Sequence, residues 1–259
     1  MKSEITIVES TKETLEDVSN LCVPPKKRDE PAFVKGIQRK IEWAQSMLDI
    51  YGNCAKLAYC DSELVGILQY IPVPHEQIIK IQCIFVPDGS YHKKGIGTRL
   101  TRALLQDVNT YQSTIDGFIP QIILAHAFDI QGQYSQHAFF EKMGFIPVKD
   151  NPEYMYYPLE KGCSYSKRQY TPQQEDKGKA IIFFDPSCPF SVFFRETLIS
   201  TLEKITDIPI QVVDIFLEEE AVRKRGWVPH CIVNTVPIRS FVFDESFCVE
   251  VKKALSTHK

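Results

Sequence analysis

Several common features are missing from this chain of 259 residues. Its eight cysteines are scattered, and no two of them form a C-x-x-C pair. The six histidines are scattered as well, so the sequence lacks the closely spaced Cys and His ligands of a zinc site. We therefore expect reduced thiols, no disulfide framework and no bound metal.

Long apolar runs are also absent. No stretch approaches the roughly 18 apolar residues of a membrane-spanning helix, and the N-terminal segment MKSEITIVEST has no apolar core of signal-peptide length. The net charge is −3, and basic runs such as Lys26-Lys27-Arg28 are short, which gives no drive toward nucleic acid or anionic membranes. We expect a cytoplasmic protein that binds neither nucleic acid nor a membrane, and the sequence leaves a homodimer open.

The most informative segment runs from Ile78 to Asp107, where an apolar strand leads through a basic turn into a helix. Gly95 and Gly97 lie in that turn. Because glycine has no side chain, the backbone N–H groups there can approach an anion closely, and the start of the helix adds the positive end of its dipole. The turn therefore predicts a site for a phosphorylated cofactor.

The spacing of the turn excludes two familiar phosphate loops. The dinucleotide motif G-x-G-x-x-G needs a glycine where this chain has Leu100, and the triphosphate loop G-x-x-x-x-G-K needs a lysine where it has Ile96. The segment HKKGIG, from His92 to Gly97, instead resembles the Q/R-x-x-G-x-G/A pyrophosphate loop of the GNAT-type acyl-coenzyme A N-acyltransferases, with histidine at the first position. A second segment, QHAFFEKMGFIPV at residues 136–148, resembles the helix, glycine cap and strand that follow the fifth sheet strand of that superfamily.

This resemblance covers roughly residues 1–160 and implies an α/β fold, with a mixed, mostly antiparallel sheet flanked by helices. The spacing of apolar residues predicts the individual elements. We expect strands at 4–9, 55–59, 64–73, 78–86, 121–128 and 154–160, and helices at 11–22, 33–51, 95–108 and 134–143.

The composition changes after Glu160. Residues 161–179 contain glycine, proline and many charges with few apolar residues, which is typical of a polar linker. Residues 180–259 show the order β-α-β-α-β-β-α, which resembles thioredoxin-like proteins and in particular the YoaP-like domain that accompanies some acyltransferases of this type. The last two strands are expected at 230–233 and 238–244. Either Val228-Pro229 or Val236-Pro237 stands where such folds place a cis-proline.

Cys188 lies in the segment DPSCPFS, at the place where thioredoxin-like proteins carry their redox motif. At a helix N-terminus its thiol is expected to have a lowered pKa. Ser191 replaces the resolving cysteine, so an internal disulfide would need a distant partner such as Cys231. Cys188 is a candidate redox residue, and the alternative is a structural domain with an unreactive cysteine.

The GNAT resemblance implies an acetyl-CoA dependent N-acetyltransferase, which moves an acetyl group directly to a primary amine of a small molecule or peptide. The strand before the turn would offer backbone groups to the pantetheine arm, and the N–H groups of the turn would hold the diphosphate. The implied cofactor-binding residues are Ile84, Phe85, Val86, His92, Lys93, Lys94, Gly95, Ile96, Gly97, Thr98 and Phe140.

Attack of an amine on a thioester needs a base for the ammonium proton and, unless the thiolate leaves unprotonated, an acid for the departing sulfur. Members of the family commonly use a tyrosine as the acid where this chain has Phe140, which cannot donate a proton. Tyr134 is the nearest hydroxyl upstream and is the candidate acid, while His126, followed closely by Asp129, is the candidate base. Two other functions stay open: an acyl-CoA sensor without turnover, which Phe140 favours, and a thiol-redox protein centred on Cys188.

Overall fold

The structure is a computed structural model of the chain, and it describes residues 4–114, 118–127, 129, 134–149 and 151–257. Contacts between Cα atoms divide the chain into two compact units. Unit 1 comprises Met1–Pro24 and Ile41–Lys167, and unit 2 comprises Pro25–Lys40 and Arg168–Lys259. The glycine turn therefore belongs to unit 1, and Cys188 belongs to unit 2.

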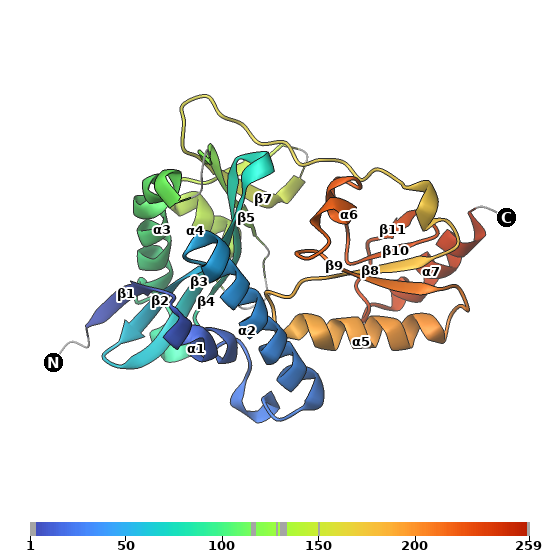
Figure 1. Cartoon of the computed structure of the whole chain (residues 1–259), viewed down its shortest axis with the longest axis horizontal. Coiled ribbons are helices and arrows are strands. Elements are labelled where there is room, and N and C mark those ends of the chain that lie inside the picture. The colour runs from blue at the N-terminus through green and yellow to red at the C-terminus, as the bar shows by residue number, and fades with distance from the viewer. Residues whose placement is uncertain (1–3, 115–117, 128, 130–133, 150, 258–259) are drawn as a thin grey trace. The chain divides into compact units, whose positions relative to one another are not determined.

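Unit 1 is built on a seven-stranded sheet in the order β1-β2-β3-β4-β5-β7-β6 (Figure 1). Neighbouring strands are antiparallel except β4 and β5, which are parallel. This is the mixed, mostly antiparallel sheet that the sequence predicts. Its strands are β1 (Ile5–Glu9), β2 (Ala55–Cys60), β3 (Glu63–Val73), β4 (Ile78–Phe85), β5 (Ile122–His126), β6 (Ile146–Val148) and β7 (Asn151–Pro158).

Helices cover both faces of this sheet. On one face, Leu100 of α3 (Ile96–Thr114) and Phe140 of α4 (Gln136–Lys142) share a buried cluster with Ile79 of β4. On the other face, Val18 of α1 (Leu15–Asn20) packs against β2 and β3. Trp43, in the part of α2 (Pro31–Tyr51) that belongs to unit 1, is also buried. The apolar spacing of the predicted helices is thus explained by burial against the sheet.

The predicted elements of unit 1 are present with shifted ends. The predicted helix at 11–22 is a 3₁₀ turn, η1 (Lys12–Thr14), followed by the short helix α1. Thr11 and Thr14 form reciprocal hydrogen bonds at its start, where the Thr14 hydroxyl accepts from the Thr11 N–H at 2.9 Å. The final strand begins at Asn151, earlier than predicted, because Asn151 pairs with Val148 of β6.

β4 carries an extra residue near its end. Its register with β3 steps over Gln82, from Ile81 to Cys83, so Gln82 is the extra residue of a β-bulge. The parallel pairing with β5 ends at Ile81 and Ala125, whereas β4 continues to Phe85. The last residues of β4 are therefore paired with β3 but have left β5.

Unit 2 contains a four-stranded sheet in the order β11-β10-β8-β9. β8 and β9 are parallel, and β10 is antiparallel to both β8 and β11. The order β-α-β-α-β-β-α along the chain agrees with the prediction. The elements are β8 (Ala180–Phe184), α5 (Phe190–Glu203), β9 (Ile210–Asp214), α6 (Glu219–Arg223), β10 (Cys231–Val233), β11 (Val236–Ile238) and α7 (Glu245–Ser256).

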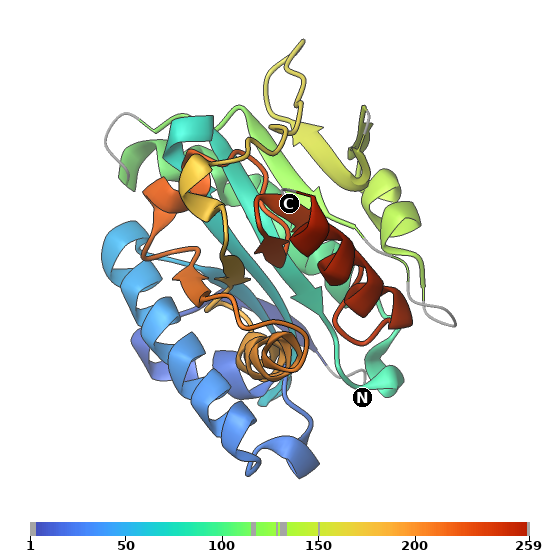
Figure 2. The ribbon, with the colours of Figure 1, turned by 90° about the vertical axis from the view of Figure 1, so that its right-hand side faces the viewer.

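Both faces of this second sheet are covered. α5 and α7 lie on one face (Figure 2). Leu202 of α5 and Phe247 of α7 belong to the buried cluster there. On the other face, Ala221 of α6 and the ring of Tyr170 pack against the strands. In the described parts of both units, no helix is long and apolar enough to cross a membrane.

Two predictions for unit 2 are wrong. β11 ends at Ile238, short of the predicted strand 238–244, because the next two N–H groups, of Arg239 and Ser240, donate to Glu250 Oε2 at 2.8 and 3.1 Å. No peptide bond among the described residues is cis, so neither Pro229 nor Pro237 is a cis-proline. The trans form is the more stable one for most X-Pro bonds, by about 0.5–1 kcal/mol.

The first turns of α2 pack inside unit 2. Phe33 is fully buried, and its ring centroid lies 5.0 Å from that of Phe190 and 5.7 Å from that of Phe193 in α5. A Cβ on Gly36 would lie 2.1 Å from the carbonyl oxygen of Pro189, closer than a real Cβ approaches any atom. Only glycine fits where α2 crosses the start of α5.

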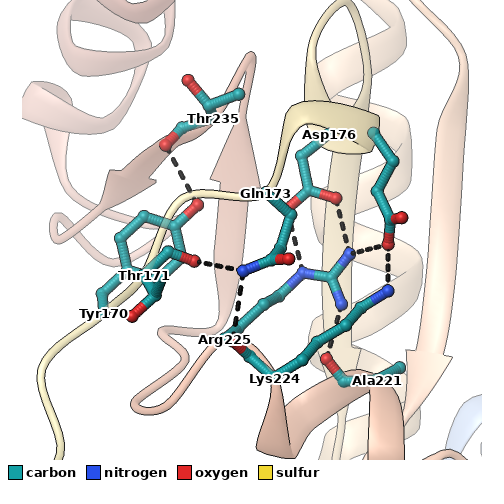
Figure 3. A network of polar contacts seen from close by, with 9 residues as sticks. Tyr170, Thr171, Gln173, Asp176, Ala221, Lys224, Arg225 and Thr235 are labelled. Atoms are coloured by element: carbon teal, nitrogen blue, oxygen red, sulfur yellow. Dashed lines mark hydrogen bonds and ion pairs between the residues drawn. The ribbon is translucent and has the colours of Figure 1, made fainter.

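Residues 170–179 form the second half of the predicted linker. They belong to unit 2, and hydrogen bonds join them to other segments of that unit (Figure 3). Asp176 is completely buried, and its carboxylate accepts from Arg225 Nε at 2.9 Å and from Nη2 at 2.5 Å. The hydroxyl of Tyr170 donates to the carbonyl of Thr235 at 3.0 Å, and the N–H of Thr171 donates to the carbonyl of Arg225 at 2.9 Å. This segment is therefore held by specific bonds, while the predicted domain boundaries at residues 160 and 180 stay a prediction.

Candidate functional site

The glycine turn is joined to β4 by a braced connection. Asp88 begins the 3₁₀ turn η4 (Gly89–Tyr91), and its Oδ1 accepts from the N–H of Ser90 at 2.7 Å. This hydrogen bond lowers the pKa of Asp88. His92 Nε2 lies 2.8 Å from the carbonyl oxygen of Val86, so the imidazole donates to the end of the strand. These bonds fix the residues between β4 and the turn.

The backbone of the turn presents a row of donors. Gly95 has a φ of +79°, which places it in the left-handed region that favours glycine. α3 begins at Ile96, so the N–H groups of Ile96, Gly97 and Thr98 lie in its first turn, where no carbonyl of the helix can accept them. The arrangement puts three N–H donors at the positive end of the α3 dipole, which is a favourable place for a phosphate.

The two glycines serve different purposes. A Cβ on Gly97 would lie 3.3 Å from Phe139 Cε2 and 3.5 Å from Ile84 Cδ1, so this glycine lets the turn pack closely on its inner side. A Cβ on Gly95 would meet nothing within 4 Å, but its positive φ would strain any larger residue. Phe139, which the sequence analysis did not select, is thus the aromatic residue that lies against the turn.

The basic side chains near the turn have different surroundings. Lys93 and Lys94 are exposed, and Lys94 Nζ lies 4.9 Å from the ring centroid of Tyr91. Arg99 Nη1 donates to the carbonyl of Ile5 in β1 at 2.9 Å, so this guanidinium is held by the first strand. The two lysines are therefore the cations available at the rim of the turn.

The strand residues predicted to meet the cofactor lie beyond the bulge. Ile84 and Phe85 pair with β3, and on their other side β5 has already ended. Ile84 and Val86 are half-buried against the cluster under α3, whereas Phe85 is exposed. Ile84 thus lies against Gly97 of the turn, and Val86 is joined to the residues before the turn through His92.

Phe140 and Tyr134 lie in contrasting environments. Phe140 is only 1% exposed, and its ring packs 5.2 Å from that of Phe139 and 5.0 Å from that of Phe145. Tyr134 is 63% exposed and immediately precedes Ser135, whose Oγ accepts from the N–H of Ala138 at the start of α4. Phe140 is a core residue here, and the Tyr134 hydroxyl is accessible.

His126 is the last residue of β5 and lies on the sheet face opposite α3. It pairs with Tyr154 of β7, and the two ring centroids are 4.9 Å apart. His126 Nε2 lies 3.9 Å from Glu153 Oε2. Burial lowers the pKa of His126 below its ordinary value of 6.5, Glu153 opposes this shift, and Lys80 and Lys167 add to it. The imidazole is therefore neutral at pH 7, as a base requires.

Asp129 and His137 brace the start of α4. His137 Nδ1 lies 3.3 Å from Asp129 Oδ1, and its Nε2 lies 2.9 Å from the carbonyl oxygen of Pro152. Asp129 Oδ2 accepts from the Ser135 hydroxyl at 3.1 Å, and this bond is the main cause of the lowered pKa of Asp129. Both groups therefore have structural roles at the start of α4, and His126 at the end of β5 stays the candidate base.

Three residues near His126 were not selected from the sequence. Glu153 and Tyr154 belong to β7, and Lys167 Nζ lies 4.0 Å from the centroid of the Tyr154 ring. Neither a motif nor a recognisable spacing marks them, because they follow the last family-like segment. They become neighbours of His126 only through the pairing of β5 with β7.

The cysteines of unit 2 have opposite exposure. Cys188 is exposed between β8 and α5, and its carbonyl accepts from the N–H of Ser191 at 3.0 Å. Cys231 is completely buried, and burial raises the pKa of its thiol to about 12. Cys231 therefore stays protonated and is a poor resolving partner for Cys188. Among the described residues, no group of three His, Cys, Asp or Glu side chains could hold a metal ion.

One family model matches part of the chain. Residues 25–145, just under half of the chain, match the family model described as acetyltransferase (GNAT) family. No curated protein matches the chain. The matched segment runs from before α2 to the end of α4, so it contains β4, the glycine turn and His126.

Solved structures that match part of this chain also include acetyltransferases. A GNAT family acetyltransferase from Staphylococcus aureus Mu50 is 17% identical, with a TM-score of 0.44, over 61% of this chain and 100% of that one. A GNAT family acetyltransferase from Brucella melitensis in complex with acetyl-CoA is 10% identical, with a TM-score of 0.43, over 63% and 92% of the two chains. PaiA N-acetyltransferase from Thermoplasma acidophilum in complex with coenzyme A is 17% identical, with a TM-score of 0.41, over 60% of this chain and 99% of that one. Residues 25–145, which carry the glycine turn, are thus the part of this chain that matches the acetyltransferase (GNAT) family.

Proposed function

We propose that this protein is an acetyl-CoA dependent N-acetyltransferase, which transfers an acetyl group to a primary amine of a small molecule or peptide. The observation that carries the proposal is the first turn of α3. Its three N–H donors come after β4 and the short connection through η4, and β4 continues beyond its pairing with the parallel strand β5. Both features lie in the segment that matches the GNAT family. The predicted cytoplasmic location is part of the same proposal.

The residues present suit the diphosphate and pantetheine of acetyl-CoA. The N–H groups of Ile96, Gly97 and Thr98 would hold the diphosphate, with Lys93 and Lys94 adding charge at the rim. The edge of β4 at Ile84 and Phe85, beyond its pairing with β5, would supply backbone groups to the amides of the pantetheine arm. Val86 would contribute less, since His92 already binds its carbonyl.

The chain's own groups would move two protons during the transfer. His126 accepts the proton that the ammonium of the acceptor must lose before its nitrogen can form a bond to the thioester carbon. As the carbon–sulfur bond breaks, the electron pair goes to sulfur. The nitrogen, now bonded to the acetyl carbon, loses its extra proton to water. The hydroxyl of Tyr134, which is an exposed residue, then protonates the thiolate and regains a proton from water, or the thiolate leaves unprotonated, since a thiol pKa near ~8.5 makes it a fair leaving group.

We expect the purified protein to bind acetyl-CoA and to release free coenzyme A thiol when a primary amine is supplied. Calorimetry measures the binding, and a thiol reagent measures turnover against a panel of amines. Binding without thiol release would support the acyl-CoA sensor, which the buried Phe140 in place of a tyrosine also favours. Absence of binding at millimolar acetyl-CoA would refute both functions.

The pH dependence of kcat/KM should reflect the ionisation of His126. A base works only when neutral, so kcat/KM should rise with pH through the pKa of His126, which burial places below 6.5. The acidic limb should therefore be centred below pH 6.5. His126→Gln should remove this limb and lower kcat by about 10²–10⁴-fold. The limb caused by ionisation of the acceptor amine should remain in the variant, and an unaltered acidic limb would exclude His126 as the base.

We further propose that unit 2 is a thioredoxin-like domain of the YoaP-like kind. The chain order β-α-β-α-β-β-α, with β8 and β9 parallel and β10 antiparallel to β8, supports this fold. The exposed position of Cys188 at the start of α5 favours thiol chemistry as a second function. Its chemistry would be limited to mixed disulfides, because Ser191 cannot form a disulfide and Cys231 is buried.

A further inference from the structure

A group of polar side chains lies on the sheet face of unit 1 opposite α3. The strand pattern puts Lys80 and His126 on this face, because their neighbours Ile78 and Leu124 belong to the buried cluster there. The ring of Tyr154 packs against the same cluster. We call Lys80, His126, Glu153, Tyr154 and Lys167 the β5-end cluster.

Direct contacts join four members of the β5-end cluster, and the strand pattern places Lys80 on the same face. The centroid of the Tyr154 ring lies 4.9 Å from that of His126 and 4.0 Å from Lys167 Nζ. Glu153 Oε2 lies 3.9 Å from His126 Nε2. Lys167 is positioned by the segment before it, because Cys163 and Tyr165 pack against the same buried cluster. The residues predicted to begin a linker thus place a cation beside the end of β5.

The β5-end cluster has a surplus of positive charge. Burial is the main cause of the lowered pKa of His126, and Lys80, Lys167 and His137 lower it further. Glu153, whose side chain is 71% exposed, opposes this shift. Burial, with Lys80 as a smaller cause, lowers the pKa of Lys167 to about 8. An anion near the two lysines would favour their charged forms and so offset the effects of burial and of repulsion.

The position of the β5-end cluster suits the acceptor rather than the donor. The glycine turn packs on the α3 side of the sheet, since Gly97 lies against Phe139 and Ile84. α3 and α4 cover that side, so an amine would reach the end of β5 from the opposite face. His126, the candidate base, lies on this opposite face with Lys80 and Lys167.

We propose that the acceptor is an amine that also carries a carboxylate, as an amino acid does, and that Lys80 and Lys167 hold this carboxylate while His126 and Glu153 face the amino group. The inference rests on the proposed function and names its substrate class. Two lysines repel a polyamine or another purely cationic acceptor. A carboxylate instead makes charge-assisted hydrogen bonds to both ammonium groups.

Glycine and glycinamide form the smallest pair of acceptors that differ only in this carboxylate. Thiol release from acetyl-CoA gives kcat/KM for each amine with wild-type protein, Lys167→Met, Lys80→Met and the control Lys161→Met, whose lysine is exposed earlier in the same segment. The two amines differ in the pKa of their amino groups. The quantity compared is therefore the change in the glycine-to-glycinamide ratio between wild type and variant.

We expect this ratio to fall at least about tenfold in Lys167→Met and in Lys80→Met, through a higher KM for glycine, and to stay unchanged in Lys161→Met. Lys167→Arg keeps the charge over the Tyr154 ring and should restore most of the ratio. If Lys167 only anchors its segment on Tyr154, Lys167→Met will lower kcat/KM for glycine and for glycinamide by the same factor, and the proposal is then wrong.

Binding of the products gives a readout that does not need turnover. Calorimetry with coenzyme A present should show tighter binding of N-acetylglycine than of N-acetylglycinamide to wild-type protein, and the difference should disappear in Lys167→Met. Equal binding of the two, or no binding of either at millimolar concentration, overturns the proposal. If the protein binds acetyl-CoA and acetylates amines without regard to a carboxylate, the proposed function stands and only this inference fails.

Discussion

Gly97→Val is expected to lower the affinity for acetyl-CoA at least about 100-fold, the loss that corresponds to two charge-assisted hydrogen bonds. The Cβ alone would lie 3.3 Å from the ring of Phe139, so the two methyl groups of valine have no room on the inner side of the turn. They must displace Phe139 or project toward the N–H groups that the diphosphate would approach. Either movement spoils the close approach of backbone and anion that the turn provides.

Calorimetry with acetyl-CoA measures this loss, and thermal unfolding shows whether the fold survives. Gly89→Ala is a matched control, because Gly89 precedes the turn, has open space around its Cβ position and is not in the left-handed region. This control should bind acetyl-CoA like the wild type. The affinity of Gly95→Ala for acetyl-CoA should lie between those of Gly89→Ala and Gly97→Val, since a Cβ fits there but the φ of +79° is unfavourable. Undiminished affinity in Gly97→Val would refute the assignment of the turn.

Asp176→Ala is expected to lower the free energy of unfolding of unit 2 by about 3–5 kcal/mol. Arg225 is only 3% exposed, and the Asp176 carboxylate accepts from two of its guanidinium nitrogens (Figure 3). Removing the carboxylate leaves most of a buried positive charge without compensation. The same substitution removes one attachment of residues 170–179, while the bonds of Tyr170 and Thr171 remain.

Urea unfolding followed by tryptophan fluorescence measures this effect. The chain has two tryptophans, Trp43 in unit 1 and Trp227 in unit 2, so a Trp43→Phe background isolates the signal of unit 2. Glu175→Ala is the control, because Glu175 contacts the same arginine from an exposed position and its loss should leave stability nearly unchanged. The double variant Asp176→Leu/Arg225→Met should recover much of the lost stability, since it removes both buried charges. If Asp176→Ala lowers the free energy of unfolding no more than Glu175→Ala does, this account is wrong.

Local sequence signals predict the strand, the glycine turn and the helix of the proposed donor side. The glycine spacing, the following amphipathic helix and the preceding apolar strand each depend on a few consecutive residues, and all three are present between Ile78 and Thr114. Prediction of individual side chains is weaker, because neighbouring residues on a helix point in different directions. Phe140 was selected by its place in a motif, yet Phe139 is the residue against Gly97.

The acceptor side could not be predicted from the sequence because it depends on pairings between distant segments. β5 and β7 place Tyr154 opposite His126, and residues after β7 bring Lys167 over the Tyr154 ring. The polar composition of 161–179 is typical of a linker, but Cys163 and Tyr165 are enough to fix its first part on one sheet. The bulge at Gln82 likewise leaves no mark in the residue types.

Helix α2 is shared, with residues 31–40 in one unit and residues 41–51 in the other. No single cut of the polypeptide can therefore release both units intact. A fragment starting at Arg168 would lack Phe33 and would expose the aromatic rings of Phe190 and Phe193 that it covers. Recombinant expression of the C-terminal portion should carry residues 25–40 as a separate, co-expressed or grafted helix if it is to remain soluble.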